Sequence, residues 1–319
     1  MNNIQDIIDL INSNNNFAIV SHTSPDGDCM GSMLGLYNSL VSYSKCVDVY
    51  LDDEIPKRLS FIPGAPNILN SFSPKEYDII FALDCGDIKR LGSFSESLLA
   101  SGKVVNIDHH LSNDMYGDVN LVIPDMSSVG EIIYNILAEG NLPINEKVAM
   151  CLYVSILSDT GGFKYSNTKP STLITVSKLL EFNIDHSKIY TKLLSEKTKE
   201  QVILSSLVSS NLELYFNEKV ALLYVTQDML TKSNVNENDS GDLVNIARDI
   251  DTVEVGILIK EKHPELYKIS LRSKDYFDVR CVAETFGGGG HTKAAGCAIN
   301  GTFEEIKAKL LAEIKGNLL

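Results

Sequence analysis

The sequence predicts an α/β protein, with a mostly parallel sheet covered by helices in a first domain and a second, smaller α/β domain at the C-terminal end. Over about the first 190 residues, short apolar runs typical of strands alternate with longer segments of helical periodicity. Strands that alternate with helices imply a parallel sheet with helices on both faces. After about residue 200 the pattern changes to pairs of strands around short turns.

The first domain begins with a helical segment, because isoleucines recur at three- and four-residue spacing from Ile4 to Ile11. The helix at 127–139 has Ser127 or Ser128 as its N-cap, and the mostly apolar helix that follows ends near Asp159. The elements expected after the first helix are a strand at 17–20, a helix at 31–43, strands at 46–51, 77–84 and 104–108, and helices at 127–139 and 145–160.

The second domain is expected to contain two strand pairs. One pair spans 212–225 around a turn at Asn217-Glu218, and the other spans 253–273 around His263-Pro264. A polar, helical stretch precedes them and serves as a connector. We therefore expect a catalytic, metal-binding domain at 1–190, a helical connector at 191–209 and a substrate-binding domain at 210–319.

Length and charge narrow the classes of function. The 319 residues are enough for a large domain and a smaller one, each with an apolar core. A formal net charge of -14 argues against a protein that binds long nucleic acid, because such binding depends on many Lys and Arg contacts to phosphates. An anionic substrate remains compatible with this charge if acidic residues hold divalent cations.

The compartment expected from the sequence is the cytoplasm. No stretch approaches the roughly 20 apolar residues of a membrane span, and the N-terminal segment does not resemble a signal peptide. The six cysteines are dispersed and form no CxxC motif, which favours free thiols over disulfides or a zinc site.

Acidic and histidine residues follow three of the predicted strands. The stretches SHTSPDGD (21–28), LDCGD (83–87) and IDHH (107–110) each come at the end of an apolar run. In open parallel sheets, ligands bind beyond the carboxyl ends of the strands. Carboxylates suit hard divalent ions, and imidazole also suits Mn²⁺, Fe²⁺ or Zn²⁺. The pattern therefore predicts a catalytic site with two metal ions at one edge of the sheet.

Each of these residues also has a simpler interpretation. Asp26 and Asp28 could form a turn and cap a helix, and His109 and His110 could be a solvated pair. Asp159 could be an ordinary loop carboxylate, although a carboxylate at the negative end of a helix is unfavourable without a cation. The occurrence of all these motifs in one chain favours the metal site.

In this order, the motifs HTSPDGDCMGS, LDCGD, IDHH and SDTGGF resemble the four motifs of the DHH phosphoesterase superfamily, and SLRSKDYFDVRCVAETFGGGGHTKAAGC resembles its DHH-associated C-terminal domain. The resemblance covers nearly the whole chain. Within the superfamily, the chain is most similar to the NrnA-type bifunctional oligoribonucleases that also act as pAp phosphatases. It implies two divalent ions, with Mn²⁺ favoured and Mg²⁺ or Co²⁺ as alternatives. The implied ligands are His22, Asp26 and Asp84 for one ion, and Asp28, His109 and Asp159 for the other, with Asp84 bridging both.

The same resemblance assigns the other site residues. His110 would face the substrate phosphate, Asp108 would support it, and Asp84 would act in catalysis through both ions. Two such ions lower the pKa of a shared water and clamp the phosphoryl oxygens during in-line displacement. In the C-terminal domain, backbone amides of a glycine run can approach an anion closely, and Arg is well matched to phosphate. The implied substrate contacts are Arg272, Ser273, Gly288, Gly289, Gly290 and His291.

The function expected from these observations is metal-dependent hydrolysis of short oligoribonucleotides to mononucleotides, together with removal of the 3′-phosphate of pAp to give AMP. We expect no binding of long nucleic acid and no membrane association. We also expect a homodimer. One alternative is a phosphodiesterase for cyclic or linear signalling dinucleotides of the c-di-AMP or pApA type. A second is a nucleotide-binding regulator without catalysis, which the complete ligand set disfavours. A family II inorganic pyrophosphatase shares the metal motifs but is disfavoured by the GGGGH segment.

Overall fold

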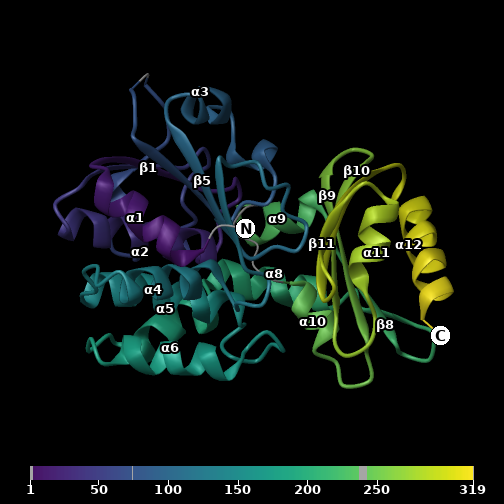
Figure 1. Cartoon of the computed structure of the whole chain (residues 1–319). Coiled ribbons are helices and arrows are strands. Elements are labelled where there is room, and N and C mark those ends of the chain that lie inside the picture. Colours follow the sequence, from purple (N-terminus) through teal and green to yellow (C-terminus); the bar gives the residue numbers. More distant parts are fainter. Residues whose placement is uncertain (1–2, 74, 237–242, 319) are drawn as a thin grey trace. The chain divides into compact units, whose positions relative to one another are not determined.

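The computed structural model describes residues 3–318 apart from residue 74 and the segment 237–242. The chain divides into two compact units, Met1–Glu196 and Lys197–Leu319, which are described here one at a time (Figure 1). Each unit contains one six-stranded sheet. The predicted α/β class with a second, smaller domain is confirmed.

The first unit is built on a fully parallel sheet with the strand order β3-β2-β1-β4-β5-β6. The chain adds strands outward on one side of β1, then returns and adds them on the other side from β4. The strands are β1 (Asn16–Val20), β2 (Cys46–Tyr50), β3 (Ile68–Leu69), β4 (Ile79–Leu83), β5 (Lys103–Asp108) and β6 (Val119–Val122).

Helices cover both faces of this sheet. The side chains of Phe17 and Ile19 on β1 lie in a large core with α1, α2, α4 and α5, whereas Ala18 and Val20 face a smaller core that includes Leu98 of α3. Both faces are apolar, as expected for a parallel sheet. The helices are α1 (Ile4–Ser13), α2 (Gly27–Ser42), α3 (Ser95–Leu99), α4 (Val129–Glu139), α5 (Glu146–Asp159), α6 (Pro170–Leu180) and α7 (His186–Tyr190), with short 3₁₀ turns η1 (Lys57–Leu59), η2 (Ala65–Asn67) and η3 (Ile88–Leu91) and a π-helical turn η4 (Thr191–Ser195).

The second unit has a mixed sheet with the order β11-β12-β10-β9-β8-β7, in which only the β8–β9 pair is parallel among the described residues. Leu222 faces a core with α11 and α12, while Leu223 faces a core with α8 and α10. The elements are α8 (Lys199–Ser209), β7 (Glu213–Tyr215), β8 (Val220–Val225), α9 (Gln227–Ser233), α10 (Val244–Arg248), β9 (Val255–His263), β10 (Leu266–Ser273), α11 (Val279–Thr285), β11 (Gly289–His291), β12 (Ala294–Asn300) and α12 (Phe303–Asn317).

Most predicted elements are present, with shifted ends. Both strand pairs of the second unit are confirmed, with their turns at the predicted residues. The helix predicted from residue 31 begins at Gly27, because Asp26 caps it. The short edge strand β6 was not predicted from the sequence, since four residues carry too little pattern. The roles and boundaries proposed for the domains stay a prediction.

Candidate metal centre

The predicted acids and histidines of the first unit gather at the carboxyl ends of β1, β4 and β5, three neighbouring strands. His22 follows β1, Asp84 follows β4, and Asp108 is the last residue of β5. The order of strands reverses between β1 and β4, and this reversal is where open α/β sheets bind ligands. The topology therefore places these side chains at the favoured site of the sheet.

The loop from β1 to α2 supplies His22 and Asp26, and the first turn of α2 supplies Asp28. His22 is buried, and its Nδ1 lies 2.7 Å from the carbonyl oxygen of Thr23. Asp26 accepts hydrogen bonds from the backbone N–H groups of Asp28 and Cys29, each at 3.0 Å, and so caps α2. The N-cap interpretation of Asp26 is thus correct, and the same carboxylate also has an oxygen within reach of His22 and Asp84.

Asp84 is held in an unusual state. It has a φ angle of 52°, in the left-handed region that non-glycine residues rarely adopt, and such strain is common at functional sites. The side chain is 2% exposed, and among the described residues its Oδ1 has no hydrogen-bond partner. Burial, followed by the nearby charges of Asp28 and Asp26, raises the pKa of Asp84 well above its usual range. A bound cation would satisfy both the orphaned oxygen and the charge.

His109 lies among three of these carboxylates. Its Nε2 is 3.3 Å from Asp159 Oδ2, 3.7 Å from Asp28 Oδ2 and 3.8 Å from Asp84 Oδ1. Burial raises the pKa of Asp28 and, together with the charge of Asp28, raises that of Asp159 well above its usual range. These shifts reflect a crowd of negative charge, which divalent ions would neutralise.

Two helices deliver Asp28 and Asp159 to the same place. Asp28 lies in the first turn of α2, and Asp159 is the last residue of α5. The two helices meet closely at Gly27, where an added Cβ would lie 2.5 Å from the Cβ of Ser158. A side chain at residue 27 would therefore push the two carboxylates apart.

Asp108 supports the histidines and takes no part in the ligand groups. It accepts hydrogen bonds from His110 Nδ1 at 2.7 Å, from the His109 N–H at 2.7 Å and from Asn113 Nδ2 at 2.6 Å. Although burial opposes ionisation, the His110 hydrogen bond and charge lower the pKa of Asp108. Asp108 is thus a buried anion that fixes the ring of His110.

The predicted ligands fall into two groups. Within each group, the candidate ligand atoms all lie within 4.8 Å of one another. The first ligand group is His22, Asp26 and Asp84, and the second ligand group is Asp28, His109 and Asp159. Asp84 also forms a group with His109 and His110, so its carboxylate lies between the two. These are the two sets that the resemblance implied, although the assignment of ions to them stays a prediction.

Several supporting residues of this site were missed from the sequence. Ser155 Oγ donates to Asp28 at 2.5 Å, and Asn113 donates to both Asp108 and Asn106. Ser155 lies 127 positions from Asp28, in the middle of an apolar helix. The signal available in the sequence was a polar residue within the apolar stretch of this helix.

The predicted substrate-binding residues lie in the second unit. The guanidinium of Arg272, on β10, donates to the Leu271 carbonyl, and the buried hydroxyl of Ser273 donates to the Phe277 carbonyl at 2.7 Å. Gly289 and Gly290, the last two glycines of the run, form the exposed strand β11 with His291. A Cβ on Gly289 would meet no atom within 4 Å, whereas one on Gly288 would lie 2.1 Å from the Gly296 carbonyl oxygen. The backbone is therefore accessible at Gly289, as an anion contact requires.

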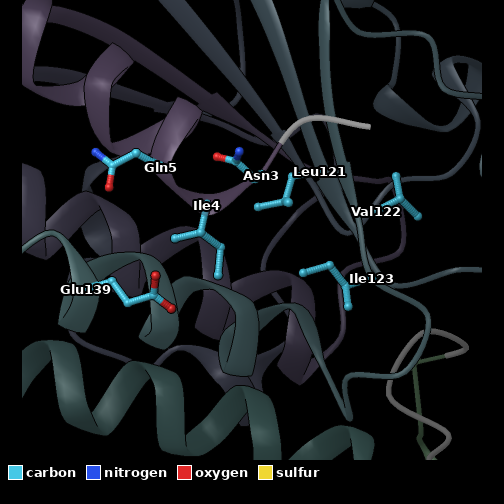
Figure 2. Close-up of a pocket in the computed structure, with 7 residues that line it drawn as sticks. All are labelled: Asn3, Ile4, Gln5, Leu121, Val122, Ile123 and Glu139. Atoms are coloured by element: carbon cyan, nitrogen blue, oxygen red, sulfur yellow. The ribbon is translucent and has the colours of Figure 1, made fainter.

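The first unit also has a cavity of about 550 Å³, which is separate from the two ligand groups (Figure 2). None of its lining residues is a predicted site residue, so it does not belong to the metal centre. The lining residues are Asn3, Ile4, Gln5, Leu121, Val122, Ile123 and Glu139.

No helix among the described residues is both long and apolar enough to span a membrane.

Comparison with known proteins gives matches over both units. Residues 16–156 match the family described as "DHH family, N-terminal domain", and residues 217–318 match the DHHA1 domain. A protein of Streptococcus mutans named "probable bifunctional oligoribonuclease and PAP phosphatase NrnA" is 30% identical, with 86% of each chain covered. One of Thermus thermophilus named "bifunctional oligoribonuclease and PAP phosphatase NrnA" is 27% identical, over 89% of this chain and 84% of the other. The crystal structure of an exopolyphosphatase-related protein from Bacteroides fragilis has a TM-score of 0.92 at 32% identity, covering 98% of this chain and 96% of that one.

Proposed function

The chain belongs to the DHH family and carries a DHHA1 domain, and from this we propose that it is a phosphoesterase that degrades short oligoribonucleotides to mononucleotides and converts pAp to AMP. Two relatives that align over 84% and 86% of their own lengths are named for both activities. The single observation that carries the chemistry is the pair of ligand groups on either side of the buried Asp84 carboxylate.

We propose that the two ligand groups hold two divalent ions and that Mn²⁺ is preferred. The donors fit such ions, because they are carboxylate oxygens with one imidazole in each group, and because the buried Oδ1 of Asp84 has no other partner among the described residues. Mg²⁺ and Co²⁺ are the alternatives. When bound, ions of this kind make water a nucleophile at neutral pH and neutralise charge on the phosphoryl group.

Hydrolysis forms a bond from a water oxygen to phosphorus and breaks the bond from phosphorus to the ester oxygen, which takes up a proton. His110 is the side chain we assign to the substrate phosphate. Its Nδ1 is occupied by the Asp108 carboxylate at 2.7 Å, so the ring is held in one orientation and Nε2 is the nitrogen that meets the phosphate. A buried aspartate that orients a histidine in this way also stabilises the ring when it carries a proton.

In the second unit we propose that Arg272, Ser273, Gly288, Gly289, Gly290 and His291 bind the phosphates or backbone of the substrate. The accessible Gly289 backbone supports this role. The scarcity of basic residues, 28 against 42 acidic ones, supports short substrates over long strands. A homodimer and a cytoplasmic location stay predictions of the sequence.

The experiment is a panel of substrates at equal concentration with Mn²⁺, analysed by chromatography. The panel contains pAp, a diribonucleotide, a five-residue RNA, a cyclic dinucleotide and pyrophosphate. We expect mononucleotides from both RNAs and AMP from pAp. Turnover of only the cyclic dinucleotide or only pyrophosphate would contradict the proposed substrate, and binding of pAp without turnover would indicate a regulator.

The matched variants are Asp84→Ala and Asp78→Asn. Asp78 precedes the amino end of β4 and binds the N–H groups of Asn15 and Asn16, far along the strand from the cluster. Asp84→Ala should reduce turnover to below a few per cent with the fold retained, while Asp78→Asn should keep it. A higher residual rate in Asp84→Ala would contradict the bridging role.

A further inference from the structure

The segment Met126–Gly130, at the start of α4, contacts two members of the second ligand group directly. The carbonyl oxygen of Met126 lies 3.2 Å from Nδ1 of His109, which turns Nε2 of that ring toward the carboxylates. The backbone N–H groups of Val129 and Gly130 donate to the two oxygens of Asp28 at 2.8 and 3.2 Å. One short segment therefore orients both an imidazole and a carboxylate of the same group.

Asn167 connects this segment to the third member. Its side-chain Nδ2 donates to the carbonyl oxygen of Ser127 at 3.0 Å and to the carbonyl oxygen of Asp159 at 3.1 Å. The amide has two hydrogens, and the two carbonyls use both. Asn167 thus ties the backbone that carries Asp159 to the segment that holds Asp28 and His109.

The segment itself is fixed in place by Glu131. This side chain is 1% exposed, and its Oε2 accepts from the Ser127 N–H at 3.2 Å, from Ser127 Oγ at 2.6 Å and from Thr172 Oγ1 at 3.0 Å. Glu131 thus links Ser127 to Thr172 of α6, and Asn167 binds the Ser127 carbonyl as well. These hydrogen bonds restrict movement of the segment Met126–Gly130. Through Asn167, the backbone of Asp159 is therefore connected to a segment that is itself held in place.

Among the described residues, the side chains of His22 and Asp26 in the first ligand group have no hydrogen bond to Asn167 or to the segment Met126–Gly130. The hydrogen bonds described for the side chains of His22 and Asp26 stay within residues 22–29. The two groups share Asp84, and the Asp28 N–H donates to Asp26, but the hydrogen bonds of Asn167 reach only the backbone around the second group. This difference makes their responses to one substitution separable.

We infer that Asn167 is a positioning residue that sets the affinity of the second ligand group for its ion without changing the affinity of the first. The inference rests on the proposed function, since it requires two bound ions. Groups that orient metal ligands change metal affinity by about 10-fold to 100-fold when they are removed. Asn167→Ala should weaken the second ion by at least about 10-fold, and Asn167→Asp, which keeps the shape but donates to neither carbonyl, should weaken it as well.

The matched control is Asn38→Ala. Asn38 is also half-buried, and its Nδ2 also donates to two backbone carbonyls, of Leu34 at 2.7 Å and Pro63 at 2.8 Å. It belongs to neither ligand group. A loss of fold stability alone would appear in both alanine variants, whereas a selective loss of one ion would appear only at residue 167.

The experiment is calorimetric titration of the full chain with Mn²⁺ in two backgrounds that each remove one ligand. Asp26→Asn disables the first group and keeps the helix cap, because Asn is as good an N-cap as Asp. Asp159→Asn disables the second. Adding Asn167→Ala should weaken Mn²⁺ binding at least about 10-fold in the Asp26→Asn background and leave it unchanged in the Asp159→Asn background.

The outcomes separate this inference from the proposed function. Equal losses in both backgrounds, or none in the Asp26→Asn background, would overturn the role of Asn167 while two ions still bind to the unsubstituted protein. If the unsubstituted protein binds no Mn²⁺, the metal site itself is refuted and this inference with it. Thermal melts of all variants, including Asn38→Ala, report the fold independently.

Discussion

Asp84→Asn should stabilise the metal-free protein while abolishing its activity. The buried carboxylate of Asp84 has an unpartnered oxygen among the described residues, and a ligand oxygen of Asp26 lies within 4.8 Å of it. At an effective dielectric constant of about 20, two negative charges at this distance repel by about 3.5 kcal/mol. The imidazole of His109, whose Nε2 lies 3.8 Å from Asp84 Oδ1, offsets part of this, so we expect a net gain of roughly 1 to 3 kcal/mol in the free energy of unfolding.

The assay is thermal unfolding in EDTA. For a unit of this size, each kcal/mol shifts Tm by about 2 to 4 °C, so Asp84→Asn should melt roughly 2 to 12 °C higher at pH 7.5. Because the folded-state pKa of Asp84 is raised, its ionisation destabilises the fold in full above that pKa, and this penalty shrinks as the pH falls from the folded-state pKa to the unfolded one, below which it is absent. The difference between variant and unsubstituted protein should therefore shrink toward pH 4.

Adding Mn²⁺ should reverse the order of the two melting temperatures, so that the unsubstituted protein melts higher than Asp84→Asn. A ligand at 100 times its Kd adds about 2.7 kcal/mol to the native state, and only the unsubstituted protein should gain this in full. Asp78→Asn is the control of opposite sign, since backbone hydrogen bonds lower the pKa of Asp78 and its removal should lower Tm slightly at pH 7.5. A metal-free Asp84→Asn protein that melts below the unsubstituted protein at pH 7.5 would refute the reasoning.

Three further predictions concern activity and packing. Asp108→Asn should lower kcat about 100-fold or more with Mn²⁺ binding retained, because His110 loses its anionic partner; unchanged kcat in steady-state assays would contradict this. Gly31→Ala should cost about 1 to 3 kcal/mol in denaturant unfolding, because the new Cβ would lie 2.5 Å from the Cys151 carbonyl oxygen. The control Gly316→Ala, with nothing within 4 Å, should be neutral or stabilise α12. Dialysis against EDTA should abolish hydrolysis of pAp and Mn²⁺ should restore it; activity that survives chelation would refute a metal-dependent reaction.

The acidic strand ends could be predicted because the signal is local. A buried strand followed by Asp or His is visible in the sequence, and parallel strands bring such ends to one edge. A metal site at this edge was therefore predicted from the pattern, whereas the division of its ligands into two groups was implied by the family resemblance. The strand order, which places β1 beside β4, was not, since it depends on which apolar faces pack together.

The supports of the site could not be predicted for a related reason. Asn167 contacts Ser127 across 40 positions, and Ser155 contacts Asp28 across 127. Nothing in the residues around Asn167 distinguishes an amide that ties two loops from one that only ends a turn. Asp26 shows the opposite limit: the helix cap and the ligand role were offered as alternatives, and the structure shows the cap with the same carboxylate within 4.8 Å of ligand atoms of His22 and Asp84.

The measurement that tests the account most directly is anomalous scattering from Mn²⁺ in crystals of the protein. We predict two peaks on either side of Asp84, one among His22, Asp26 and Asp84 and the other among Asp28, His109, Asp159 and Asp84. A single peak, or peaks away from the carboxyl ends of β1, β4 and β5, would contradict a two-metal centre.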